Sequence, residues 1–114
     1  LGVTFKPDTD DMREASSLFM IPYSAKRGSI INYFDPTGSK KEFSKIKRVF
    51  YKSDIKSACY NADIVIIHTE WNEFKFLNFK NLIKNKNFKI FDMRNIYSPN
   101  KMKKNNISYH AIGR

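Results

Sequence analysis

Cysteine is almost absent from the 114-residue sequence, which contains only Cys59. A single cysteine excludes an internal disulfide framework and is typical of a reducing, cytoplasmic compartment. A metal site made of cysteine and histidine is also disfavoured, because only His68 and His110 are present as further ligands. Cys59 falls on the apolar stripe of a predicted helix, so we interpret it as a small core residue and not as a nucleophile.

Long hydrophobic runs are missing as well. No stretch approaches the roughly 20 apolar residues that cross a bilayer, and the amino terminus does not resemble a signal peptide. We therefore expect a cytoplasmic protein with no membrane association. The sequence opens inside an apolar pattern and without an initiator methionine, so we expect the natural sequence to continue upstream of Leu1.

Acidic residues are outnumbered, with 11 Asp and Glu against 21 Lys and Arg and a net charge of +10. This excess has two interpretations. It could attract a polyanion, either nucleic acid or a phosphorylated metabolite. It could also reflect lysines scattered over solvated surfaces in a lysine- and asparagine-rich chain. The basic residues are spread along the whole sequence, which favours the second interpretation.

Apolar side chains are plentiful enough for a packed domain, at 41% hydrophobic and 15% aromatic residues. The β-branched run at residues 63–68 predicts a strand covered on both faces. Before it, apolar residues at helical spacing over 55–62 predict a short helix capped by Ser53 or Asp54. Further strands are predicted at 1–5, 29–34, 48–51, 88–91 and 107–110, and helices at 15–27 and 79–83. This alternation predicts one domain over residues 1–114, a doubly wound, mostly parallel Rossmann-like α/β sheet flanked by helices.

The helix predicted at 15–27 has two notable features. Leu18, Ile21 and Ala25 fall on one face, which we expect to be buried, and Gly28 suits the left-handed position after the last turn. Pro22 removes a hydrogen bond from the helix interior, so we expect either a bend or a late start.

Polar segments follow the predicted strands. In an open α/β sheet, ligands bind beyond the carboxyl ends of the strands. Residues 5–14, 35–36, 69–71 and 92–95 all come directly after predicted strands. We therefore predict that these segments meet along one rim of the sheet.

Lys6 and Arg94 are the cations best placed on this rim to hold a phosphate or another polar ligand. Lysine is a compact point charge, whereas the planar arginine fork can grip two oxygens at once. Each could instead pair with an acid nearby, Lys6 with Asp8 or Asp10, and Arg94 with Asp92. Position in the sequence leaves the two interpretations open.

Other candidates carry a weaker signal. Arg13 and Glu14 lie at a predicted helix start, where the dipole suits the acid but not the cation, which hints at another role for Arg13. Asp35 stands where dinucleotide-binding folds place the acid that holds a ribose. However, the sequence has no GxGxxG turn, so we expect no NAD site made by this domain alone. His68 and Trp71 are interpreted as structural.

Several motifs carry a family resemblance. Residues 2–15, GVTFKPDTDDMREA, resemble the FKPxTDDxREA block that opens the third domain of the nucleotide-sugar dehydrogenases. Three later segments resemble the UDP-glucose 6-dehydrogenases within that family: YFDP at 33–36, TEWxEF at 69–74 and FDxRNxY at 91–97. The closing Gly113-Arg114 fits the same pattern, and the motifs follow one another in the family's order.

The resemblance implies the UDP-sugar-binding domain of an enzyme that oxidises UDP-glucose to UDP-glucuronate with two NAD molecules. It implies that an NAD-binding domain and a central helical region with the nucleophilic cysteine lie upstream, that the whole enzyme is a homodimer, and that residues 1–114 alone are inactive. By motif, Phe5, Lys6 and Arg94 would bind the UDP-sugar, and Arg13 would reach the NAD held by the other domain. Cys59 does not match the family's nucleophile.

Three other interpretations remain. A GDP-mannose or UDP-N-acetyl-sugar dehydrogenase shares the first block but usually lacks the TEW and DxRN segments. A basic nucleic-acid-binding module normally has Lys and Arg interleaved with exposed aromatic residues. Here the aromatic residues lie mainly in predicted strands, so we expect no nucleic-acid partner. A scaffold fragment that binds no ligand is the third alternative.

Overall fold

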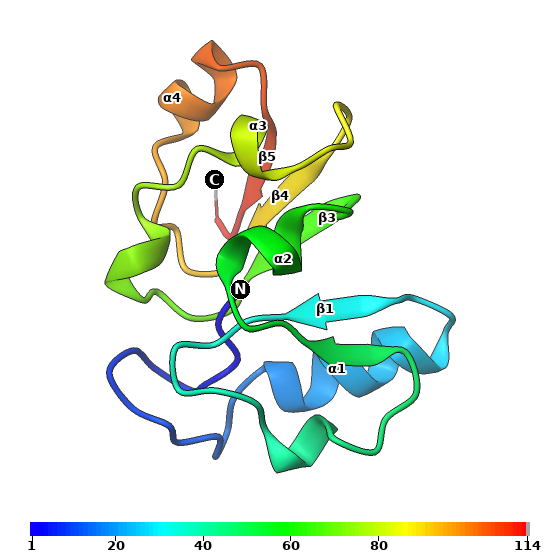
Figure 1. The fold of residues 1–114 in the computed structure, drawn as a ribbon. Coiled ribbons are helices and arrows are strands. Elements are labelled where there is room, and N and C mark those ends of the chain that lie inside the picture. The colour runs from blue at the N-terminus through cyan, green and yellow to red at the C-terminus, as the bar shows by residue number, and fades with distance from the viewer. Residues whose placement is uncertain (114) are drawn as a thin grey trace.

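The computed structural model describes residues 1–113, which form an α/β domain (Figure 1). No helix among them is long and apolar enough to cross a membrane. The elements in chain order are α1 (Ser17–Lys26), β1 (Ile31–Tyr33), η1 (Lys41–Phe43), β2 (Val49–Tyr51), α2 (Ile55–Cys59), β3 (Ile64–Ile67), η2 (Asn72–Phe74), α3 (Phe79–Leu82), β4 (Lys89–Asp92), α4 (Pro99–Lys104) and β5 (Ser108–Ala111).

The strand pairings are parallel, in two sheets with the orders β1-β2 and β3-β4-β5. The first residues of the chain lie between the two sheets (Figure 1). The Leu1 amino group donates to the carbonyl of Ile66 at 2.6 Å, and the His68 N–H returns a hydrogen bond to the Leu1 carbonyl at 3.1 Å. On the other side, the Gly2 N–H donates to the carbonyl of Phe34 at 2.9 Å. The predicted parallel, Rossmann-like α/β fold is therefore confirmed.

The strand predicted at residues 1–5 is not formed as a strand. Leu1 makes both hydrogen bonds of one parallel bridge to β3, but the pairing with β1 stops after the single bond from Gly2. The residue that would return that bond is Pro36, which has no N–H. Residues 1–3 thus occupy the place of a central strand without a continuous ladder.

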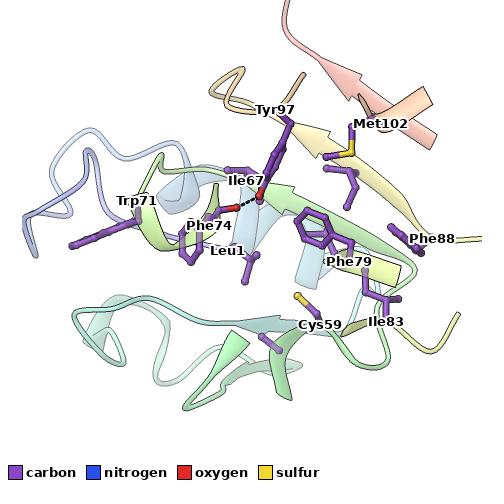
Figure 2. Close-up of a cluster of buried hydrophobic side chains, with 13 residues drawn as sticks. Leu1, Cys59, Ile67, Trp71, Phe74, Phe79, Ile83, Phe88, Tyr97 and Met102 are labelled. Carbon is purple, nitrogen blue, oxygen red and sulfur yellow. Dashed lines mark hydrogen bonds between the residues drawn. The ribbon is translucent and has the colours of Figure 1, made fainter. Parts of the chain in front are cut away.

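Two apolar clusters stabilise the sheets. The larger joins β3 and β4 to α2, α3 and α4 through Val65, Ile67, Ile90, Cys59, Phe79 and Met102. Figure 2 shows Cys59, Ile67, Phe79 and Met102 in one cluster with Phe74 and Tyr97. The smaller joins α1, β1 and η1 through Val3, Met12, Ile21, Tyr33 and Phe43. Burying a side chain of this size contributes about 1.5–3 kcal/mol. Cys59 is buried, as predicted from its stripe.

α1 begins at Ser17, two residues later than predicted, and keeps Pro22 in its interior. Its buried face consists of Ser17, Ile21 and Ala25, so the prediction of Leu18 on that face was wrong, and Leu18 is 36% exposed. Ser17 can occupy the core because its hydroxyl donates to the carbonyl of Val3 at 2.5 Å. Gly28 has a φ of +99°, the left-handed conformation expected after the helix.

The start of α2, the faces of β3 and the start of α4 can also be compared with the predictions. Asp54 caps α2 by accepting a hydrogen bond from the Ser57 N–H at 2.7 Å. β3 is not covered on both faces, because Ile64 is 50% exposed. α4 was not predicted, although Ser98 and Pro99 carry its start signal: the Ser98 hydroxyl accepts a hydrogen bond from the Lys101 N–H at 3.3 Å, and proline stands in the first turn.

Candidate functional site

Arg94 joins three segments at the carboxyl ends of the strands. Its Nε donates to the carbonyl of His68 at 2.6 Å, just past β3, and its Nη2 donates to the carbonyl of Phe5 at 2.9 Å. Glu70 Oε2 lies 3.9 Å from the same Nε. Residues after β3, after β4 and after the amino-terminal segment therefore meet at one edge. Lys6 follows Phe5 in the sequence, so its backbone lies next to the carbonyl that Arg94 contacts.

Asp92 shapes the loop that carries Arg94. The carboxylate is buried, with one oxygen accepting from the Arg94 backbone N–H at 3.0 Å. The other oxygen accepts from the N–H groups of Ile96 and Tyr97 at 2.8 and 3.1 Å and from the Tyr109 hydroxyl at 2.6 Å. Asp92 thus binds the backbone of this loop, while the guanidinium group of Arg94 reaches the neighbouring segments. The alternative in which Arg94 pairs with Asp92 is not what the structure shows.

Thr4 holds the segment that carries Phe5 and Lys6. Its hydroxyl donates to the carbonyl of Lys6 at 3.1 Å and accepts from the indole N–H of Trp71 at 3.3 Å. The hydroxyl of Thr69 donates to the carbonyl of Thr4 at 2.6 Å. Phe5 is 39% exposed and Lys6 is exposed, and within residues 1–113 no acid lies in ion-pair distance of Lys6. Trp71 is buried, so it packs, as predicted, and its indole hydrogen bond is an addition that the sequence did not predict.

Asp35 does not have the environment of a ribose-binding acid. It is fully buried, and one carboxylate oxygen accepts from the N–H groups of Val3 and Thr4 at 2.8 and 3.3 Å. The other accepts from the N–H and hydroxyl of Thr37 at 2.9 and 2.6 Å. The carboxylate therefore fastens the amino-terminal segment to the end of β1. This arrangement does not fit the ribose of a dinucleotide at this position.

Arg13 lies in the loop between the amino-terminal segment and α1. The idea that it opens a helix was wrong, because α1 begins at Ser17 and Glu14 has a φ of 61°. The 89% exposed Arg13 side chain pairs with Asp11, with Nε 3.0 Å from one carboxylate oxygen and Nη2 3.0 Å from the other. This pair holds the pKa of Asp11 down to about 2. The Phe5 N–H donates to the Asp11 carbonyl at 2.9 Å, which brings this loop back to the rim.

These motifs match a known family over most of the chain. Residues 1–99 match the family model described as "UDP-glucose/GDP-mannose dehydrogenase family, UDP binding domain". The chain belongs to this dehydrogenase family.

Curated relatives agree with this assignment. The UDP-glucose 6-dehydrogenase of Rhizobium meliloti is 36% identical over 115 residues, which cover 100% of this chain and 26% of the relative. The UDP-glucose 6-dehydrogenase of Rickettsia prowazekii is 36% identical, and the match covers 99% of this chain and 27% of the relative. The UDP-glucose 6-dehydrogenase TuaD of Bacillus subtilis is 33% identical, and the match covers 100% of this chain and 25% of the relative. The chain spans about a quarter of the length of these dehydrogenases. The resemblance drawn from the sequence motifs is confirmed.

Sequence reasoning missed the buried residues behind the dehydrogenase motifs. Asp92, Thr4 and Thr69 contact backbone groups of the rim segments and lie inside the sequence blocks that carry the resemblance. Their signal was a short polar residue at or near the end of an apolar run. Because such a run is buried, a polar residue there needs hydrogen-bond partners.

His68 is buried beside the site, with Nδ1 3.2 Å from the Ser16 hydroxyl. Burial, with smaller effects of the positive charges at the Leu1 amino group and Arg94, lowers the pKa of His68 to about 3. Below pH 6.5 an unfolded chain therefore binds a proton that the folded chain refuses, so stability falls as the pH drops from about 6.5 to about 3. His68→Asn is expected to flatten this part of the curve of unfolding free energy against pH.

The matched control for this experiment is His110→Asn, at an exposed histidine stacked on Phe91. Urea unfolding at a series of pH values gives the curve for each variant. An unchanged slope in His68→Asn, or an equal change in His110→Asn, would show that His68 does not cause the acid sensitivity.

Gly2 is required by its surroundings. It has a φ of +74°, and a Cβ at this position would lie 2.9 Å from Thr69 Cβ and 3.0 Å from the Phe74 ring. Gly2→Ala adds left-handed strain and overpacking, so we expect a loss of about 2–3 kcal/mol in the free energy of unfolding. Gly38→Ala is the control, since it shares a positive φ but has open space around it. Equal losses of unfolding free energy in the two variants would show that only the left-handed backbone strain matters and that the close contacts at Gly2 do not.

Proposed function

We propose that this chain is the UDP-sugar-binding part of an enzyme that oxidises UDP-glucose to UDP-glucuronate with two NAD molecules. The contact of Arg94 with the carbonyls of Phe5 and His68 is the observation that carries this proposal. It brings together two motif segments of the dehydrogenase family and the residue directly before a third, at the edge of a parallel sheet where ligands of such folds bind. The relatives are UDP-glucose 6-dehydrogenases, and their names supply the substrate and the reaction type for this proposal.

The roles of the site residues follow from their exposure and charge. The Lys6 ammonium is exposed and suits a diphosphate. Arginine has five N–H donors, and the two hydrogen bonds of Arg94 to carbonyls use two of them, which leaves donors for the oxygens of the ligand. Phe5 is 39% exposed and offers an apolar contact. We assign all three to binding of the sugar nucleotide.

NAD binding is assigned to another part of the enzyme. The buried Asp35 has its oxygens occupied by backbone and Thr37 donors, and the sequence has no glycine-rich phosphate turn. When bound, NAD accepts the hydride. In this chain only Arg13 is proposed to contact NAD, from its exposed position on the loop held by Asp11. The match covers about a quarter of the relatives' length, and we assign NAD binding to the remaining three quarters. We propose that the whole enzyme is a cytoplasmic homodimer.

Calorimetric titration of the 114-residue chain tests the proposal. UDP and UDP-glucose are expected to give saturable binding, and GDP is expected to give little or none. A single-stranded oligonucleotide at several salt concentrations is the control for the net charge of +10. Tighter binding of GDP than of UDP would assign the chain to another member of the family. A salt-sensitive affinity for the oligonucleotide above that for UDP-glucose would contradict the proposal.

A further inference from the structure

A cleft of about 690 Å³ separates β1 from β3, in line with the amino-terminal segment. β1 and β3 form two of its walls, with α1 and α2 on either side, and Leu1 stands at one end. Figure 1 shows the amino terminus between these two strands. Leu1 and Gly2 thus fill the layer between the sheets only near the carboxyl ends of the strands, and the cleft takes up the rest of that layer.

Backbone groups of β3 point into the cleft. The carbonyls of Asp63 and Ile67 accept hydrogen bonds, at 3.0 and 3.1 Å, from the chain at the two ends of β4. Because the backbone groups of successive residues in a parallel ladder point to opposite sides, those of Ile64 and Ile66 point away from β4. The hydrogen bond from the Leu1 amino group to the Ile66 carbonyl agrees with this direction.

β1 presents the same pattern on the other wall of the cleft. The Ile31 N–H donates toward β2, and the Tyr33 carbonyl accepts from that side, both at 2.8 Å. The N–H and carbonyl of Asn32 therefore point into the cleft. Within residues 1–113, neither the N–H of Asn32 nor that of Ile66 has a hydrogen-bond partner in the protein. Unpaired groups along a strand edge are a template for a further strand.

The width of the cleft selects an extended chain. Leu1 and Gly2 form hydrogen bonds to β3 on one side and to the end of β1 on the other. The two strands are therefore two strand spacings apart at this point, which is about 10 Å. A helix with its side chains is about 10–12 Å across and pairs its own backbone groups, so it would leave both edges unsatisfied. One strand fits the space and pairs with both edges.

We propose that the residues directly preceding Leu1 in the natural polypeptide fill the cleft as a central strand, parallel to β1 and β3. This strand joins the two sheets into a single one with the order β2, β1, central strand, β3, β4, β5. The inference rests on the proposed function only in that the chain is part of a longer polypeptide. β1 and β3 have 3 and 4 residues, so the central strand needs a similar length beyond Leu1.

Leu1 fixes the register of the central strand. It donates to the carbonyl of Ile66 and accepts from the N–H of His68. By continuation of this ladder, the residue two positions before Leu1 donates to the carbonyl of Ile64 and accepts from the N–H of Ile66. The residue directly before Leu1 is turned to the other side and donates to the carbonyl of Asn32.

The two faces of the central strand meet different helices. The Leu1 side chain belongs to the cluster that contains Ala58 and Cys59, so the residue two positions before Leu1 shares that face. The residue directly before Leu1 points to the opposite face, where Met20 and Ile21 of α1 line the cleft. Because both faces are covered by helices, we expect apolar residues at these positions.

Amide hydrogen exchange in the full-length enzyme, read by mass spectrometry at single-residue resolution, tests the central strand. The N–H groups of Asn32 and Ile66 are expected to exchange on the order of 100-fold more slowly than that of Tyr51. Tyr51 is the internal control, because it lies on the outer edge of β2 and its N–H is turned away from β1. Exchange of Asn32 and Ile66 as fast as that of Tyr51 would overturn the proposal.

An insertion tests whether the occupant is continuous with Leu1. Two aspartates inserted directly before Leu1 place charges in the apolar cleft, so exchange of Ile66 is expected to become about tenfold faster or more. The N–H of Ile90, within β4, is expected to stay protected and so reports that the sheet remains folded. The control is the same insertion after Phe76, which is 93% exposed, and it is expected to leave both rates unchanged.

Unchanged protection of Ile66 after the insertion before Leu1 would show that another segment or a second copy fills the cleft, and would overturn the proposal. Equal effects of the two insertions would also contradict it. The exchange measurement needs neither UDP-glucose nor NAD. Its failure is therefore distinct from a failure of the calorimetric titration, which tests the proposed function.

Discussion

Asp35→Asn is expected to lower the free energy of unfolding by about 2–4 kcal/mol, a large part of the stability of a domain of this size. The fully buried carboxylate accepts four hydrogen bonds, two from the backbone N–H groups of Val3 and Thr4 and two from Thr37. An asparagine side chain must turn its amide N–H groups toward one of these donor pairs. The N–H groups of that amide then face buried donors with no acceptor between them, which is more unfavourable than the loss of a solvent-exposed hydrogen bond.

Urea unfolding measures this loss, and a fall in melting temperature of roughly 10 °C is expected with it. Asp54→Asn is the matched control, because Asp54 is exposed and caps α2 by accepting a hydrogen bond from the Ser57 N–H, and asparagine is an equally good cap. Loss of UDP binding should accompany the destabilisation, since Thr4 carries the Phe5 and Lys6 segment. Equal stability of the two variants would contradict the role given to Asp35.

The parallel α/β order could be predicted because apolar periodicity and turn residues are local signals. β2, the Asp54 cap of α2 and the edge strand β5 all lie where these signals placed them. The buried face of α1 could not be predicted in full. Hydrophobicity favours Leu18 over Ser17, and only the fold shows that the Ser17 hydroxyl finds the carbonyl of Val3.

Coverage of a strand is likewise a tertiary property. The β-branched run of β3 predicted two buried faces, and the half-exposed Ile64 shows that only one is covered within residues 1–113.

The convergence of the rim segments could be predicted from the rule for parallel sheets. The direction in which each carboxylate points could not be predicted. Asp35 and Asp92 both follow strand ends in the sequence, yet both turn inward to backbone N–H groups. The sequence shows an acid at a strand end but not which way it points.

Arg94→Ala is expected to weaken binding of UDP-glucose by roughly 30- to 1000-fold, which corresponds to about 2–4 kcal/mol. Two effects add. The variant removes a partly buried guanidinium from the site, and it leaves the carbonyls of Phe5 and His68 without their donor. The second effect loosens the segment that presents Lys6, so the loss should exceed that of Lys6→Ala. Calorimetric titration with UDP-glucose gives the affinities.

Arg94→Lys separates these two effects. It keeps the positive charge but cannot reach both carbonyls with a planar fork, so it is expected to recover only part of the affinity. Lys86→Ala, at an exposed lysine away from the rim segments, controls for net charge and should bind UDP-glucose like the unaltered chain. If Arg94→Ala bound UDP-glucose normally while its thermal stability fell, Arg94 would be a brace between strand ends and not a ligand contact. If Arg94→Lys recovered the full affinity, charge alone would suffice, and the geometry of the guanidinium would not select the ligand.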